Sequence, residues 1–331
     1  MPNEITRRTF LSRSALATAV GAAPLAAGAG RAAESGGEHD LSGTVPSGAA
    51  AALPTGRIRD LPVSRLLLGG NLLTHFTHSR DLQYVYRLAE HYNTEEKILE
   101  TLALAEAYGI NTLVIHTVPR TMQILRRHRH ERGGQINWII CPTAPVEGDL
   151  AAYRDQVRGL VDDGVDAVYL WGVRADALTA TGEMELLARA VELPRSLGVP
   201  SGVGAHDLRV IQACEKAGVD ADFYIKTFHH HRYPSAPRPE QVVAPISEVP
   251  GYWCKDPDEV VATMATVQKP WIAFKVMAAG AIPPADAFAY AFGGGADHVL
   301  AGMFDFEIAE DARLAAAAAA AAKDRARPWR S

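Results

Sequence analysis

The sequence predicts a (β/α)₈ barrel, in which eight parallel strands alternate with helices and close into one barrel. Two observations support this fold class. From Arg57 onward, short apolar runs alternate with segments of helical periodicity, a pattern typical of parallel βα units. The apolar runs number eight, which is the number of strands that such a barrel needs. The expected strands are residues 64–70, 111–117, 137–143, 167–173, 199–206, the run around Lys226, 271–277 and 298–305.

The segments between these strands have the features of helices. The first, residues 94–108, begins with Thr94, a residue type that caps helices, and repeats apolar residues at helical spacing. The last, residues 307–322, contains an alanine run that would close the outer wall. A doubly wound open sheet is the alternative, but it normally has a GxGxxG turn after its first strand, and residues 68–71 do not supply one. The other expected helices are residues 149–163, 183–197, 207–217 and 257–267.

The N-terminal segment indicates export. Residues 6–11, TRRTFL, form a twin-arginine pattern, and a weakly apolar Ala/Gly-rich stretch follows over residues 15–29. We expect residues 1–33 to be a Tat signal peptide that the Tat export machinery recognises. The mature protein is then periplasmic or extracellular, without a stable membrane anchor. Residues 34–56, rich in Gly, Ser, Ala and Pro, are expected to be a disordered linker before a barrel domain over residues 57–331.

Charge and cysteine content narrow the class of partner. The formal net charge is −5 and no basic stripe is interleaved with aromatic residues, so nucleic acid is not an expected partner. The three cysteines, Cys141, Cys214 and Cys254, have no CxxC spacing and are expected to be buried apolar residues. The expected partner is therefore a small-molecule substrate.

Two predicted strands carry a lysine among apolar residues. Lys226 lies in the run FYIKTF and Lys275 in the run WIAFKVM. On the helix-facing side of a strand, a lysine would be a buried unpaired charge that costs on the order of several kcal/mol, so both are predicted to point into the barrel. Repulsion between them would lower the pKa of one and make it a nucleophile or base. The alternative is a structural role, in which each lysine pairs with an acid or caps carbonyl groups.

Histidines gather at the predicted strand ends. His206 ends the fifth strand, and residues 229–231 are three consecutive histidines after the sixth. Alternation with a period of two places His230 on the same face as Lys226, so His230 is predicted to point inward as well, with His229 and His231 as alternatives if the strand ends early. The alternative is that the histidines are exposed to solvent or hydrogen-bonded within the fold. The candidate ligands of a divalent metal such as Zn²⁺ or Mn²⁺ are His116, His206, His229 and His230.

Two long connections supply candidate substrate-binding groups. Residues 72–93 follow the first strand and residues 232–256 follow the sixth, and long loops at this end of a barrel usually contact substrate. Asp305 and Glu307, after the eighth strand, are the best candidates for an acid, and Asp305 is expected to polarise the site. Arg80 and Asp81 have a structural alternative, since they could pair with each other. The candidate substrate-binding residues are Asn71, His75, Arg80, Asp81, Trp171 and Trp253.

Three segments resemble the aldo/keto reductase family. Residues 61–71, LPVSRLLLGGN, are similar to its first strand, and residues 105–117, AEAYGINTLVIHT, to the end of its first helix and its second strand. Residues 299–311, VLAGMFDFEIAED, are similar to its eighth strand and following helix. The resemblance implies a barrel fold and, in that family, hydride transfer from NADPH.

The chain differs from the family at the positions of the family's catalytic and cofactor-binding residues. The family's aspartate at the end of the second strand corresponds to Val114, and residues 120–123 contain no tyrosine. In place of the family's basic site for the cofactor phosphate, the chain has four acidic residues. NADPH is therefore not the favoured cofactor, although a divalent metal is still considered. The four acidic residues are Asp305, Glu307, Glu310 and Asp311.

A second, local resemblance concerns the two lysine strands. The runs FYIKTF around Lys226 and FKVMAAGAI around Lys275 resemble the lysine strands of deoxyribose-phosphate aldolase. That enzyme is a barrel that forms a Schiff base, so the resemblance implies imine chemistry at one of the two lysines.

Together these observations predict an exported (β/α)₈ enzyme of the lyase, aldolase or isomerase type that acts on a small carbonyl or carbohydrate-like substrate. Lys226 or Lys275 would abstract a proton or form an imine, with His206 and His230 as acid/base groups or metal ligands and Asp305 polarising the site. Two alternatives are an NADPH-dependent oxidoreductase and a periplasmic binding barrel without catalysis.

Overall fold

A computed structural model describes residues 53–331. The predicted signal peptide over residues 1–33 and most of the predicted linker over residues 34–56 lie outside the described residues. The first strand, β1 (Thr55–Ile58), begins two residues before the predicted start of the barrel domain. Within the described part of the chain, no helix is long and apolar enough to cross a membrane.

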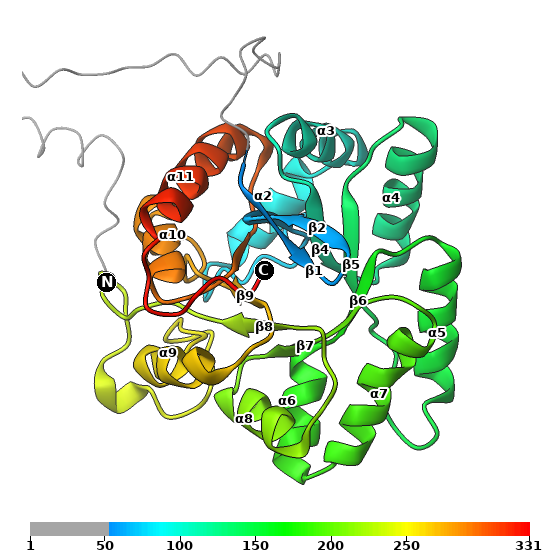
Figure 1. Ribbon diagram of the computed structural model, residues 1–331. Coiled ribbons are helices and arrows are strands. Elements are labelled where there is room, and N and C mark those ends of the chain that lie inside the picture. Colours follow the sequence, from blue (N-terminus) through cyan, green and yellow to red (C-terminus); the bar gives the residue numbers. More distant parts are fainter. Residues whose placement is uncertain (1–52) are drawn as a thin grey trace, which may run out of the picture. The chain divides into compact units, whose positions relative to one another are not determined.

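Eight parallel strands close into a barrel, so the predicted fold class is confirmed. The strands follow one another around the barrel in chain order (Figure 1). β10 pairs with β3 to complete the ring. All eight predicted strands are present, each somewhat shorter than its apolar run. The barrel strands are β3 (Leu66–Gly69), β4 (Thr112–His116), β5 (Asn137–Cys141), β6 (Ala167–Leu170), β7 (Ser201–Ala205), β8 (Phe223–Thr227), β9 (Trp271–Phe274) and β10 (His298–Ala301).

Helices form the layer outside the barrel (Figure 1). Four helices, α2, α4, α6 and α10, are not among the predicted ones. The predicted helices correspond to α3, α5, α7, α8, α9 and α11. The helices are α2 (Gln83–Tyr92), α3 (Glu95–Ala107), α4 (Pro119–Glu131), α5 (Ala151–Asp162), α6 (Gly172–Thr181), α7 (Met184–Ser196), α8 (Leu208–Ala217), α9 (Pro257–Thr266), α10 (Pro284–Gly293) and α11 (Ile308–Ala321), with short 3₁₀ helices η1 (Pro239–Gln241) and η2 (Asp305–Glu307).

An antiparallel hairpin closes the end of the barrel at which the strands begin. It consists of β1 and β2 (Leu61–Ser64), and it lies across the barrel axis in Figure 1. Asn111 and Asn137, at the starts of β4 and β5, both donate side-chain hydrogen bonds to the carbonyl oxygen of Pro62. Ile58 and Val63 are fully buried against the interior side chains of the barrel strands. The hairpin therefore plugs this end, and the other end is left for a site.

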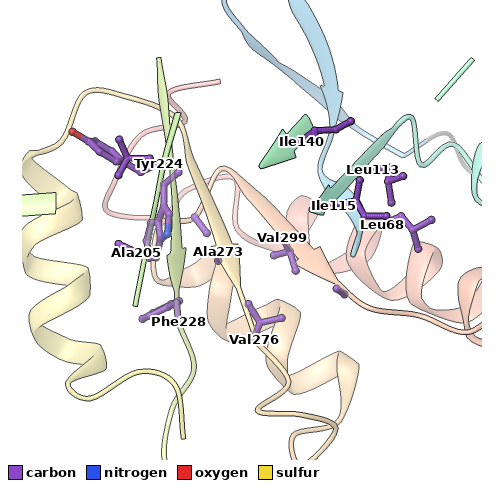
Figure 2. Packing of buried hydrophobic residues seen from close by; sticks show 14 of the residues in the cluster. Leu68, Leu113, Ile115, Ile140, Ala205, Tyr224, Phe228, Ala273, Val276 and Val299 are labelled. Carbon is purple, nitrogen blue, oxygen red and sulfur yellow. The ribbon is translucent and has the colours of Figure 1, made fainter. Parts of the chain in front are cut away.

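The strands alternate between two apolar layers, and this alternation corrects one prediction. In β8, Phe223 and Ile225 belong to the barrel interior, whereas Tyr224 belongs to the larger cluster between strands and helices, part of which is shown in Figure 2. Lys226 shares the face of Tyr224 and is buried in the outer layer. The prediction that Lys226 points into the barrel is wrong.

Two hydrogen bonds to Thr227 offset the cost of burying Lys226. Its Nζ donates hydrogen bonds to the carbonyl oxygen and the side-chain hydroxyl of Thr227, at 2.8 and 2.9 Å. Burial also lowers the pKa of Lys226, which reduces the charge that must be kept out of water. An outward-facing lysine is tolerated at this position because its hydrogen bonds to Thr227 leave it paired.

A buried ion cluster near the starts of β9 and β10 anchors the C-terminal segment. The carboxylate of Asp297 is fully buried and pairs with Arg325 at 2.9 Å and with Arg327 at 2.7 Å. The ring of Trp329 packs against the guanidinium groups of Arg65 and Arg325, at 4.2 and 3.5 Å. The segment after α11 is thus tied to the barrel by charge pairs with little access to water.

The substitution Asp297→Ala is expected to destabilise the fold by about 3–5 kcal/mol, because it leaves two buried guanidinium groups without their carboxylate. Chemical denaturation monitored by circular dichroism measures the change. Asp162→Ala is the matched control, since Asp162 is exposed on α5, and its effect should stay within about 0.5 kcal/mol. Equal effects of the two substitutions would contradict a stabilising role of the cluster.

Candidate active site

Two adjoining cavities open at the end of the barrel opposite the hairpin. The first, here called the β6–β7 cavity, has a volume of about 310 Å³ and reaches Trp171 and His206. The second, here called the β9–β10 cavity, has a volume of about 420 Å³ and reaches Gly302 and Glu307. Both volumes suit small-molecule ligands. The residues that line both cavities are Asn71, Phe76, His78, His116, Tyr169, Phe274 and Lys275.

A chain of three hydrogen-bonded side chains lies where the two cavities meet. The Nζ of Lys275 lies 3.0 Å from Nε2 of His78, and Nδ1 of His78 lies 2.8 Å from Oε1 of Glu248. The indole of Trp253 donates a hydrogen bond to the same Oε1, at 3.1 Å. These residues come from the loops after β3, β8 and β9, so three separate connections converge on one amine.

Burial and these neighbours set the protonation of the chain. Burial lowers the pKa of Lys275 to about 7, although the charge of Glu248 acts to raise it. Burial also lowers the pKa of His78. For Glu248, burial acts to raise the pKa, but its contacts with His78 and the other partners outweigh burial and lower it. Near neutral pH, about half of the Lys275 side chains are therefore neutral amines beside a carboxylate and a neutral imidazole.

Backbone strain concentrates in the two loops that carry His78 and Lys275. His78 has φ 47° and Lys275 has φ 55°, a left-handed conformation that non-glycine residues rarely adopt. For Lys275, which follows the last residue of β9, the reversal ends the strand and lets the side chain line the cavities. Such strain is typical of functional sites. The same loops contain four further non-glycine residues with positive φ, namely His75, Arg80, Ala278 and Ala279.

A histidine and aspartate pair forms a second polar group in the β6–β7 cavity. Nδ1 of His206, just after β7, lies 2.7 Å from Oδ2 of Asp176 on α6. The other carboxylate oxygen accepts hydrogen bonds from the backbone N–H groups of His206 and Asp207, which hold Asp176 in place. Burial lowers the pKa of His206, while Asp176 acts to raise it. Nε2 of His206 has no hydrogen-bond partner among residues 53–331, so it is free to exchange a proton with a ligand.

Aromatic rings form much of the cavity wall. The imidazole of His116 lies parallel to the indole of Trp171, with ring centroids 6.4 Å apart. Phe76 meets the ring of His78 edge to face at 4.8 Å, and Phe274 closes the floor shared by both cavities. These walls exclude water from the neighbourhood of Lys275, which is the cause of its lowered pKa.

The structure brings together some of the predicted site residues. Lys275 and His116 line both cavities, and His206 lines the β6–β7 cavity. Of the predicted substrate-binding residues, Asn71 lines both cavities, Trp171 lines the β6–β7 cavity and Trp253 lines the β9–β10 cavity.

The predicted metal ligands are not brought together. Both ring nitrogens of His229 contact backbone groups, the carbonyl oxygen of His230 at 2.9 Å and the N–H of Trp253 at 2.9 Å. His230 also lies outside the cavities, with Nε2 at 3.0 Å from Asp286, so the prediction that it points inward is wrong. The reason is the outward face that it shares with Lys226. In the described part of the chain, no group of three or more His, Cys, Asp or Glu side chains is arranged to hold a metal ion.

Four other predicted site residues lie away from the cavities. Asp305 accepts a hydrogen bond from Tyr92 at 2.7 Å and pairs with Lys97 at 3.0 Å, so it holds helices rather than substrate. His75 contacts the carbonyl oxygen of Asn93, Arg80 donates to the carbonyl oxygen of Ala278, and Asp81 is exposed. Asp305, His75, Arg80 and Asp81 are therefore not among the residues that line the two cavities.

Three residues of the site are not among the predicted site residues. His78 lies in the long loop after β3, Glu248 in the loop after β8, and Asp176 on α6. Asp176 could have been predicted from the sequence. It lies about one turn into the helix after β6, and a residue at that place lies close to the residue that follows β7, here His206. Nothing local in the sequence distinguishes Glu248 or His78 from other polar loop residues.

The closed ring of eight parallel strands, with two cavities at the end opposite the hairpin (here called the mouth of the barrel), defines a (β/α)₈ barrel of the kind that enzymes use. Similar solved structures include an aldo-keto reductase from Bacillus halodurans in its holo form, with a TM-score of 0.53 and 12% identity over 79% of this chain and 90% of that chain. Another aldo/keto reductase, from Brucella melitensis, has a TM-score of 0.49 and 11% identity over 78% of this chain and 91% of its own. At 12% identity, the similarity to the Bacillus halodurans structure establishes the fold alone.

A third similar structure is an N-acetylneuraminic acid synthetase from Leptospira borgpetersenii, with a TM-score of 0.45 and 10% identity over 82% of this chain and 89% of that chain. No protein-family model and no curated protein sequence matches the chain. The residues that line the two cavities are therefore the basis for proposing a reaction.

The substitution Glu248→Gln is expected to lower the pKa of Lys275 below about 7, because the anion that favours the ammonium form is removed. A lower pKa means a larger neutral fraction at pH 7, and hence faster reaction with an amine-directed reagent. NMR of ¹³C-dimethylated Lys275 across a pH series measures the pKa directly. Glu240→Gln, an exposed carboxylate on the same loop, should leave it unchanged. A pKa that rises in Glu248→Gln would contradict the assigned electrostatics.

Proposed function

We propose that the protein is a carbonyl-transforming enzyme of the lyase or isomerase type, in which Lys275 forms an imine with a small carbonyl or carbohydrate-like substrate. The observation that carries this proposal is the position and environment of Lys275. Its amine lies at the junction of two ligand-sized cavities, has a pKa lowered to about 7, and has no salt bridge to a carboxylate within residues 53–331. An amine that is partly neutral near pH 7 is a competent nucleophile.

The proposed reaction begins with attack of the neutral Nζ on the substrate carbonyl carbon. His78, 3.0 Å away, accepts a proton from the attacking nitrogen and passes it to the former carbonyl oxygen. That oxygen takes a second proton from solvent and leaves as water when the carbon–nitrogen double bond forms. The resulting iminium withdraws electrons from the adjacent carbon. A neighbouring C–H or C–C bond can then break, and its electron pair is held in the enamine. Hydrolysis by one water molecule releases the product and restores the amine.

The His206 and Asp176 pair is proposed as the second proton-transfer group. Asp176 holds Nδ1 of His206, which leaves Nε2 facing the β6–β7 cavity. From there Nε2 can move a proton to or from the carbon next to the iminium. Because burial lowers the pKa of His206, the neutral form that accepts protons is favoured at neutral pH.

The polar side chains that line the cavities do not form a set of metal ligands. Both ring nitrogens of His78 are occupied by Lys275 and Glu248, and His229 and His230 are turned away from the cavities. The residues do not fit a metal ion, and no step of the proposed reaction passes through one.

Sodium borohydride is expected to trap the substrate on Lys275 as a stable secondary amine when the protein is incubated with sugars and keto compounds. Peptide mass spectrometry would locate the added mass. Lys275→Met should lose the adduct, because thioether sulfur cannot form an imine. Lys255→Met is the matched control, since Lys255 is exposed in the loop after β8. Absence of an adduct on Lys275 with every compound of the panel would sink the imine proposal.

The alternative of an NADPH-dependent oxidoreductase draws on the fold similarity to aldo-keto reductases. The rim after β10 argues against it, because Glu307 lines the β9–β10 cavity and burial, with the charges of Glu307 and Glu310, raises the pKa of Asp311 to about 7. A cluster of carboxylates repels a phosphorylated cofactor.

Calorimetric titration with NADPH is therefore expected to show no binding at micromolar concentrations. Glu307→Gln provides the matched comparison, since removal of one carboxylate should strengthen any residual binding. A micromolar dissociation constant for the unaltered protein would instead favour the oxidoreductase.

A further inference from the structure

The charged groups that face the two cavities are few. Among the described lining residues, Lys275, Glu248 and Glu307 are the residues with ionisable acid or amine side chains, and no arginine is present. Proteins usually bind phosphate and carboxylate groups through arginine, lysine or a helix N-terminus. The first turn of α6 reaches the β6–β7 cavity at Gly172 and Val173, but Asp176 lies on the same helix and Glu248 lines the same cavity, and these two carboxylates oppose the positive end of the helix. The cavities are therefore poorly suited to an anionic ligand.

Uncharged hydrogen-bonding groups without protein partners are present at the same place. Within residues 53–331, neither the side-chain amide of Asn71 nor the ring of His116 has a hydrogen bond, although both line the two cavities. The hydroxyl of Thr77, in the wall of the β9–β10 cavity, is buried without a partner. A buried hydroxyl without a partner costs free energy unless a ligand or water satisfies it. These groups match the hydroxyl groups of a polyhydroxylated ligand.

The aromatic walls add a second feature. Trp171 and Phe76 line the β6–β7 cavity, and Phe76, Trp253 and Phe304 line the β9–β10 cavity. Both cavities thus combine aromatic faces with a few neutral polar groups, as small-molecule sites usually do. The C–H face of a sugar ring packs on an aromatic ring while its hydroxyl groups reach the polar atoms, so each cavity suits one sugar unit.

Lys275 lies between the cavities rather than at the end of either one. We propose that the substrate is an uncharged carbohydrate of two units that carries a keto group, with one unit in each cavity and the keto carbon next to Nζ of Lys275. This inference rests on the proposed imine function and specifies its substrate class. It excludes phosphorylated sugars and keto acids as the preferred substrates.

Calorimetric titration of the full-length protein tests the substrate class without depending on turnover. The probes are the neutral ketose disaccharides lactulose, maltulose, turanose and isomaltulose, together with fructose and fructose 6-phosphate. At least one disaccharide is expected to bind about tenfold more tightly than fructose, and fructose 6-phosphate is expected to bind more weakly than fructose. The inference is overturned if no disaccharide binds more tightly than fructose, or if the phosphate ester binds best.

A variant that fills one cavity sharpens the test. Ala281→Phe places a ring in the wall of the β9–β10 cavity and is expected to reduce disaccharide affinity to the level of fructose. Ala180→Phe, at an exposed position on α6, adds the same ring away from the site and should change neither affinity. A disaccharide affinity that Ala281→Phe does not reduce would overturn the assignment of one unit to each cavity.

The failure of this inference can be told apart from failure of the proposed function. A borohydride adduct on Lys275 with fructose 6-phosphate, and not with neutral disaccharides, would support imine chemistry and overturn the substrate class. Tight binding of a neutral disaccharide without any adduct on Lys275 would support the substrate class and overturn the imine.

Discussion

Closure of the barrel is the constraint on which the rest of this structure depends. Since β10 pairs with β3, every barrel strand has hydrogen-bonded neighbours on both sides and no edge is left open. Closure also gathers the inward side chains into one apolar column, and Ile58 and Val63 of the hairpin fill its lower end. The opposite end of the column opens into the two cavities, so the loops after the strands are the segments that can shape a site.

The mouth combines desolvation with a small number of fixed polar contacts. Aromatic and apolar walls make the charged form of Lys275 costly, while the chain through His78 to Glu248 holds the amine in position. Positive φ at His78 and Lys275 shows that the backbone tolerates strain to place these two groups together. The His206 and Asp176 pair follows β7, two strands from Lys275 in the barrel order, and His206 lines the same β6–β7 cavity as Lys275.

Much of the fold, and only part of the site, follows from local sequence. All eight barrel strands can be predicted from apolar runs in the sequence. A parallel strand is buried on both faces, so its residues are apolar without interruption. The two lysines show where this reasoning stops. Lys226 and Lys275 occupy similar runs, but Lys226 lies within a regular strand and turns outward, whereas Lys275 lies one residue after its strand and reaches the cavities. Export of the protein stays a prediction, since its signal lies outside the described residues.

The sequence by itself determined the strand count, the barrel and the end at which chemistry belongs, since apolar periodicity and chain connectivity carry that information. Tertiary structure alone decided which polar residues share the site. His78, Glu248 and Lys275 are separated by up to 197 positions along the chain and meet through hydrogen bonds between loops. Loop conformation depends on packing against the whole mouth rather than on local propensity, and local patterns therefore could not reveal the partners of Lys275.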